Sequence, residues 1–110
     1  MLNTREIGSV QVIDLEQKLD TQTAAPTQEA LLLFLSNQPA QVLINLSGLE
    51  FVSSAGLRVI LRAAKQVRSY KGAMKVAGAS GMVKEVLEIS GFDSLLDMYE
   101  LEQQALDSFG

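Results

Sequence analysis

The chain has 110 residues, 47% of them apolar, and its 13 acidic and 9 basic residues give a formal net charge of −4. This length and composition are typical of one globular domain, 1–110, with a sizeable core. The negative charge disfavours nucleic acid and anionic membrane surfaces as partners. Cysteine and histidine are absent. We therefore expect a reduced, cytoplasmic setting, and neither enzymatic activity nor a metal site, because histidine is the commonest general base and transition-metal ligand.

The N-terminal part of the chain predicts a hairpin and then a helix. Val10 to Leu15 form a β-branched segment after a possible turn at Gly8-Ser9, and a weaker extended stretch lies around Arg5 to Ile7. Thr21 or Thr23 can cap a helix whose apolar residues recur at helical spacing up to Ser36. The first nine residues lack the apolar core of a signal peptide, and the longest apolar run in the chain is too short to span a bilayer, so we expect no membrane insertion.

A central strand and the longest helix follow. Val42 to Leu46 form an apolar run of strand length, which is typical of a strand covered on both faces. The Gly48 to Val52 segment is interpreted as a turn into a helix that ends near Gly72. The apolar residues of that helix share one face, and they are Leu57, Ile60, Leu61, Ala64 and Val67.

The last third of the chain alternates strands and helices. Met74 to Ala77 predict a strand, Ser80 can cap a helix that ends before Gly91, a strand follows near Leu96 to Tyr99, and a final helix covers Leu101 to Phe109. Gly-Ala-Ser-Gly at 78–81 lacks the lysine of a phosphate-binding loop and is interpreted as a strand-to-helix turn. The whole pattern predicts an α/β fold with a mixed β-sheet of about four to five strands and about four helices packed against it.

Two adjacent serines, Ser53 and Ser54, lie at the predicted start of the longest helix. A serine there can cap a free backbone N–H, and the helix dipole places partial positive charge at this point, so a phosphate on a hydroxyl would be held. Phosphorylation would add about −1.5 to −2 charges to a small neutral surface. On local grounds alone, a purely structural cap is the simpler interpretation. A hydrolase nucleophile is excluded, because Val52 replaces the glycine of that motif and no histidine exists.

The serine segment resembles the signature of the STAS family, named for sulphate transporters and anti-sigma factor antagonists. The resemblance covers residues 5–108 and is closest to standalone anti-sigma factor antagonists. The matching motifs are Asn45-Leu46-Ser47, the apolar pair Phe51-Val52, Ser53-Ser54-Ala55-Gly56-Leu57, and Lys18-Leu19-Asp20 with Thr23-Ala24. The family usually has Asp-Ser-Ser-Gly-Leu, so Ser53 stands in place of an aspartate and Ala55 in place of the second serine.

The resemblance implies a single STAS domain that acts as a phosphoregulated switch. Unphosphorylated, it would bind an anti-sigma factor or related serine kinase and so release that protein's client. The kinase, which itself binds the ATP, would phosphorylate Ser54, with Ser53 as second choice, and end the complex. A PP2C-like phosphatase would reset the switch. The chain would then be a substrate without a cofactor of its own, and we expect a monomer, with a weak dimer as the alternative.

The partner surface is expected to include Asp20, Ser53, Ser54, Ala55, Gly56, Arg58 and Arg62. Arg58, Arg62 and Lys65 fall in a narrow arc opposite the apolar face of the helix, with Arg68 further round, and this arc is either a docking surface or an ordinary solvated face. Asp20 resembles a family acidic position, although a turn aspartate explains it locally.

Three further interpretations remain at this stage. The carboxylates Asp93, Asp97, Glu100 and Glu102 follow no calcium-loop spacing and predict a solvated acidic edge. Within the same family, the chain could instead be a standalone subunit of a transport assembly, for example a lipid-trafficking complex, without a phosphorylation cycle. It could also be a domain that binds a nucleotide or another small molecule.

Overall fold

The computed structural model describes residues 2–109. In chain order the elements are β1 (Leu2–Ile7), β2 (Val10–Leu15), β3 (Gln17–Leu19), α1 (Ala24–Leu35), β4 (Gln41–Asn45), β5 (Leu49–Val52), α2 (Ser54–Ser69), β6 (Ala73–Ala77), α3 (Gly81–Ile89), α4 (Phe92–Leu95), β7 (Asp97–Tyr99) and α5 (Glu102–Ser108). None of these helices is both long enough and apolar enough to cross a lipid bilayer.

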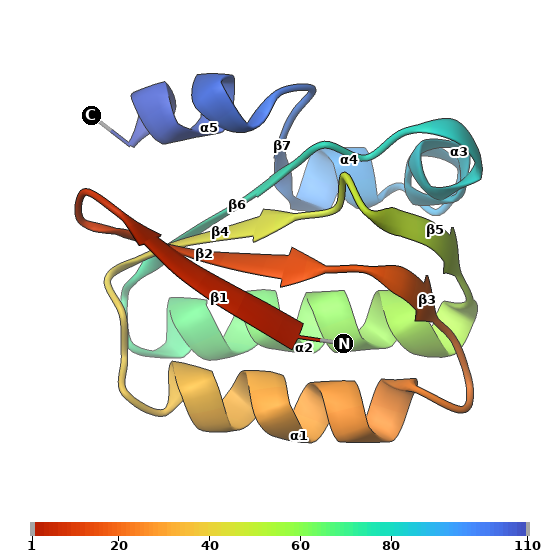
Figure 1. Ribbon diagram of the computed structural model, residues 1–110, viewed down its shortest axis with the longest axis horizontal. Coiled ribbons are helices and arrows are strands. Elements are labelled where there is room, and N and C mark those ends of the chain that lie inside the picture. Colours follow the sequence, from red (N-terminus) through yellow and green to blue (C-terminus); the bar gives the residue numbers. More distant parts are fainter. Residues whose placement is uncertain (1, 110) are drawn as a thin grey trace.

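A five-stranded mixed sheet in the order β1-β2-β4-β6-β7 forms the centre of the molecule, with β1 antiparallel to β2 and the other neighbours parallel. Helices α1 and α2 lie side by side along one face of this sheet, and α5 lies on the opposite side (Figure 1). Side chains from α1, α2 and the sheet form the main core, and a smaller cluster around Ala105 packs beneath α5. The predicted α/β fold is confirmed.

The opening hairpin and the central strand are also confirmed. Gly8, in the turn between β1 and β2, has φ of +60°, a conformation that glycine adopts without steric cost. In β4, Val42, Leu43 and Ile44 are all 1% exposed or less, as expected for a strand covered on both faces. The predicted helix from about Thr23 to Ser36 is α1, with Thr23 and Ser36 as its flanking cap residues.

The interpretation of the segment from Gly48 to Val52 as a turn is wrong. Residues 49–52 form β5, which pairs in parallel with β3 as a separate two-stranded sheet. The short helix α4 was also not predicted. Residues 78–80 connect β6 to α3 as predicted, and Gly81 is the first residue of α3. Gly78 has φ of +84°, and a Cβ atom there would also collide with the Ser47 hydroxyl.

A polar network attaches α5 to the sheet. Arg5 of β1 donates two hydrogen bonds to Asp14 of β2, at 2.7 and 2.8 Å, and also pairs with Glu102 of α5. Asn45, a polar residue only 8% exposed, donates from Nδ2 to the Glu102 carboxylate at 2.7 Å. The prediction of a solvated acidic edge is therefore wrong for Glu102. The hydrogen bond from Arg5 lowers the pKa of the Glu102 carboxyl most, and the hydrogen bond from Asn45 lowers it further.

We predict that Glu102→Gln lowers the free energy of unfolding at pH 7 by about 1 kcal/mol, a modest value because water screens the exposed Arg5 side chain. A carboxyl whose pKa is depressed by folding stabilises the fold above its unfolded-state pKa. The difference between wild type and variant should therefore shrink as the pH falls below the ordinary value of 4.5.

Urea denaturation from pH 7 down to pH 3 measures this effect, with Glu100→Gln as the control. Glu100 is exposed and lies 3.9 Å from Lys84, so its loss should cost only a few tenths of a kcal/mol, about the lower limit for surface pairs. A deficit for Glu102→Gln that stays constant across the pH range would show that its charge is not the cause.

Candidate functional site

Ser53 is the N-cap of α2, and two hydrogen bonds hold it. Its backbone is extended, with φ −100° and ψ 176°, and its Oγ accepts a hydrogen bond from the backbone N–H of Gly56 at 3.3 Å. Its own backbone N–H donates to the Leu19 carbonyl oxygen at 3.0 Å, which continues the pairing of β3 with β5. The Ser53 hydroxyl is thus engaged in starting the helix.

Ser54 is the first residue of α2, and its environment differs from that of Ser53. The residue is exposed, and its hydroxyl makes no hydrogen bond within residues 2–109. The positive end of the helix dipole lies at this position, and no acidic residue occupies the first turn. Of the two adjacent serines, Ser54 presents the free hydroxyl.

Gly56 brings the first turn of α2 directly onto the short sheet. It is buried, and a Cβ atom there would collide with the Leu19 carbonyl oxygen and the Val52 side chain. A glycine is therefore required for this close approach. Ala55, by contrast, is half-buried and faces the groove between α1 and α2.

Asp20 lies beside this helix start, because the register of β3 and β5 pairs Leu19 with Val52. Its Oδ1 accepts backbone N–H groups from Thr23 at 3.1 Å and Gln22 at 3.0 Å. These two hydrogen bonds lower the pKa of the Asp20 carboxyl, and the one from Thr23 has the larger effect. The turn interpretation of Asp20 is confirmed, and the turn places a carboxylate next to the serine pair.

The basic residues of α2 lie where the helical periodicity predicts. Arg58, Arg62 and Lys65 are exposed and line a groove of about 700 Å³ between α1 and α2. Arg68 is exposed as well but lies outside the groove lining. Six of the seven residues predicted for the partner surface are at least partly exposed, on the β3–α1 turn and on α2 up to Arg62, whereas Gly56 is buried beneath them.

A family model described as the STAS domain matches residues 1–105 of the chain. The chain belongs to the STAS domain family. It is 30% identical over 108 residues to BtrV of Bordetella bronchiseptica, provisionally named an anti-sigma factor antagonist, with 98% of this chain and 93% of BtrV covered. It is 24% identical over 100 residues to the anti-sigma-F factor antagonist RsfB of Mycobacterium tuberculosis, with 90% and 80% covered.

Solved structures named as anti-sigma factor antagonists have the same fold. A Thermotoga maritima protein, again provisionally named an anti-sigma factor antagonist, aligns with a TM-score of 0.91 at 19% identity, over 97% of this chain and 92% of that one. SpoIIAA, an anti-sigma factor antagonist from Bacillus, aligns with TM-scores of 0.73 in its unphosphorylated form and 0.74 in its phosphorylated form. The identities to SpoIIAA are 16% and 17%, with at least 97% of each chain covered.

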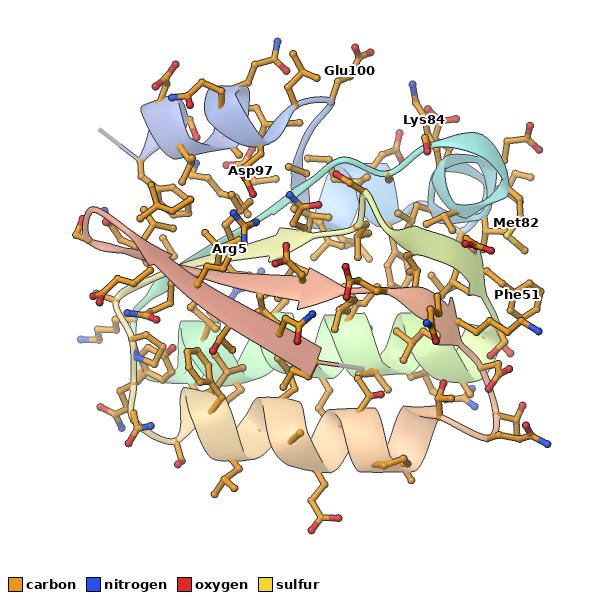
Figure 2. All side chains as sticks on the ribbon, viewed as in Figure 1. Arg5, Phe51, Met82, Lys84, Asp97 and Glu100 are labelled. Carbon is orange, nitrogen blue, oxygen red and sulfur yellow. The ribbon has the colours of Figure 1, made fainter. Side chains whose placement is uncertain are left out.

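Two apolar side chains of this STAS domain also lie near the helix start and were not predicted as site residues. Phe51 of β5 and Met82 of α3 are each 39% exposed, at the end of the molecule where α3 packs on β5 (Figure 2). The sequence offered one signal, since Phe51 belongs to the apolar pair of the motif. Its partner in that pair, Val52, is buried in the core.

We predict that the two serines differ in their effect on the stability of the STAS domain. Ser53→Ala removes the cap and should lower the free energy of unfolding by about 1 kcal/mol, whereas Ser54→Ala should change it by only a few tenths, about as much as a neutral surface substitution. Chemical denaturation of both variants measures the difference. Equal losses, or a larger loss for Ser54→Ala, would contradict the assignment of Ser53 as the cap.

Proposed function

We propose that this STAS domain is a phosphoregulated interaction switch. Its unphosphorylated form binds an anti-sigma factor or a related serine kinase, and binding frees the client that this partner otherwise holds. The observation that carries the proposal is the exposed Ser54 hydroxyl at the first position of a helix whose start is fixed by the fold. The class of partner is supported by the names of the relatives that match almost the whole chain.

Ser54 is the phosphate acceptor in this proposal. A kinase must reach the hydroxyl oxygen and align it with the phosphate donor, which requires an oxygen that the fold leaves free. Ser54 is exposed, whereas the Ser53 oxygen accepts the N–H of Gly56 and would have to give up that bond. The ATP is bound by the kinase, so the chain needs no cofactor and acts as a substrate.

The phosphate acts by changing the charge of the partner surface while the fold stays intact. At the first position of α2 it lies at the positive end of the helix dipole, which stabilises an anion. It also lies one turn before Arg58, so a dianion reverses the local charge where the basic arc begins. Burying that dianion in an interface is unfavourable because the dianion loses its hydration, and it also repels acidic groups of the partner. A PP2C-like phosphatase restores the binding form.

We predict that incubation with the cognate kinase and ATP adds one phosphate, on Ser54. Mass spectrometry should find it in the wild type and in Ser53→Ala but not in Ser54→Ala. In a separate binding assay, Ser54→Asp should weaken the partner complex, because even a single negative charge offsets part of the positive charge of the basic arc.

The variants also define the outcomes against the proposal. A phosphate found only on Ser53 would move the assignment by one residue. If no form accepts phosphate and Ser54→Asp binds the partner as tightly as the wild type, the switch is wrong and the domain is a constitutive docking subunit.

A further inference from the structure

Charges of opposite sign are strongly segregated along this chain. The stretch from Phe51 to Lys84 contains no acidic residue. It carries seven of the nine basic residues, which are Arg58, Arg62, Lys65, Arg68, Lys71, Lys75 and Lys84. All 13 acidic residues lie before or after this stretch. A protein with a net charge of −4 therefore has a locally cationic surface, centred on α2.

The groove between α1 and α2 concentrates this positive charge. Arg58, Arg62 and Lys65 line one wall, and none of the three forms an ion pair within residues 2–109, whereas Lys75 pairs with Asp97 at 2.7 Å. No carboxylate among the described residues lines the groove. The remaining lining residues are uncharged, namely Ala24, Ala25, Gln28, Ala55, Val59, Leu61 and Gln66.

The two helices add to the positive potential of the groove. Figure 1 shows α1 and α2 running side by side in the same direction, with the loops that lead into them at the same end of the molecule. Neither helix has an acidic residue in its first turn. The Asp20 carboxylate, which accepts N–H groups in the turn that leads into α1, offsets part of the positive charge at that end. The groove therefore combines three cations that form no ion pair within residues 2–109, two helix starts and three alanines among its uncharged lining residues.

We propose that this groove docks an acidic segment of a partner protein. The cations follow one another at intervals of four and three residues, so their Cα atoms span about 10 Å along α2. A segment with carboxylates at matching helical intervals would pair with all three cations at once. The small side chains Ala24, Ala25 and Ala55 leave room for the backbone of such a segment to approach.

A protein segment fits the groove better than the other polyanions. An anionic bilayer would require large apolar side chains to enter it, and the exposed lining residues are the three cations and Ala25. A nucleic acid is a long polyanion that would also meet the acidic parts of the chain. The inference rests on the proposed function and deepens it, because Ala55, Arg58 and Arg62 belong to both the expected partner surface and the groove.

The test uses the full chain and a short helical peptide with glutamates at positions i, i+4 and i+7 on an alanine background. A second peptide with glutamine at those positions is the control for charge. In an NMR titration of the ¹⁵N-labelled protein, the Glu peptide should shift the amide signals of the first turn of α1 and of residues 55–66. The Gln peptide should shift none of them.

Two double variants test whether the peptide binds through the groove or through the overall positive charge of α2. Arg58→Gln with Arg62→Gln should weaken the Glu peptide about tenfold, the loss of roughly 1.4 kcal/mol of binding free energy. Arg68→Gln with Lys71→Gln removes the same charge outside the groove lining and should leave the affinity within about twofold of wild type, a difference of roughly 0.4 kcal/mol.

Several results would overturn the inference. They are equal binding of the two peptides, equal losses in the two double variants, and amide shifts outside the groove. Self-association that shifts the groove signals would assign the groove to a second copy of the chain, and preferential binding to phosphatidylglycerol vesicles would assign it to a membrane. The titration contains no kinase or ATP, so its failure is separate from failure of phosphorylation at Ser54.

Discussion

The direct packing of the first turn of α2 against the end of β3 determines the geometry of the whole site. Gly56 allows this approach because a Cβ atom would collide with the Leu19 carbonyl oxygen, and the same carbonyl accepts the backbone N–H of Ser53. The helix therefore has one possible starting point. Once it is fixed, Ser53 turns its oxygen inward as the cap and Ser54 points to solvent. A shift of one residue would exchange these two roles.

The positions of the surface charges depend on this fixed start of α2. Cations follow Ser54 along the solvent side of α2, on the face of the sheet that α1 shares (Figure 1). The Arg5 network holds Glu102, and with it α5, on the opposite side of the sheet. The sheet thus separates the cationic groove from the acidic C-terminal helix. In such an arrangement a single dianion at Ser54 changes the field over a small, well-defined area.

The parts of the fold that local sequence predicts are those with strong periodicity. The apolar run of β4 and the one-sided apolar face of α2 are determined by their own residues, and both were predicted close to their observed bounds. The strands β3 and β5 have three and four residues, and they are stable only because they pair with each other across a distance in sequence. No local pattern contains that pairing, so β5 could not be predicted from its own residues.

The candidate site could be predicted only in part, for the same reason. The resemblance to the family motif placed both serines at the helix start and favoured Ser54 as the phosphate acceptor, but the motif does not show which of the two hydroxyls the fold leaves free. The extended backbone of Ser53 makes that distinction, and it depends on Leu19, more than thirty residues earlier. The arc of cations was visible in the helical spacing. The groove was not, because α1 supplies its second wall.

The central claim is that phosphate on Ser54 acts locally on a rigid helix start. The most direct measurement compares fully phosphorylated and unphosphorylated protein, recording affinity for the cognate anti-sigma factor by calorimetry and the ¹H–¹⁵N spectrum of the same samples. The account predicts a loss of affinity of at least about tenfold, or 1.4 kcal/mol, with amide shifts confined to the β3–α1 turn and the first turns of α2. Unchanged affinity, or a loss accompanied by shifts throughout β4 and the core, would contradict it.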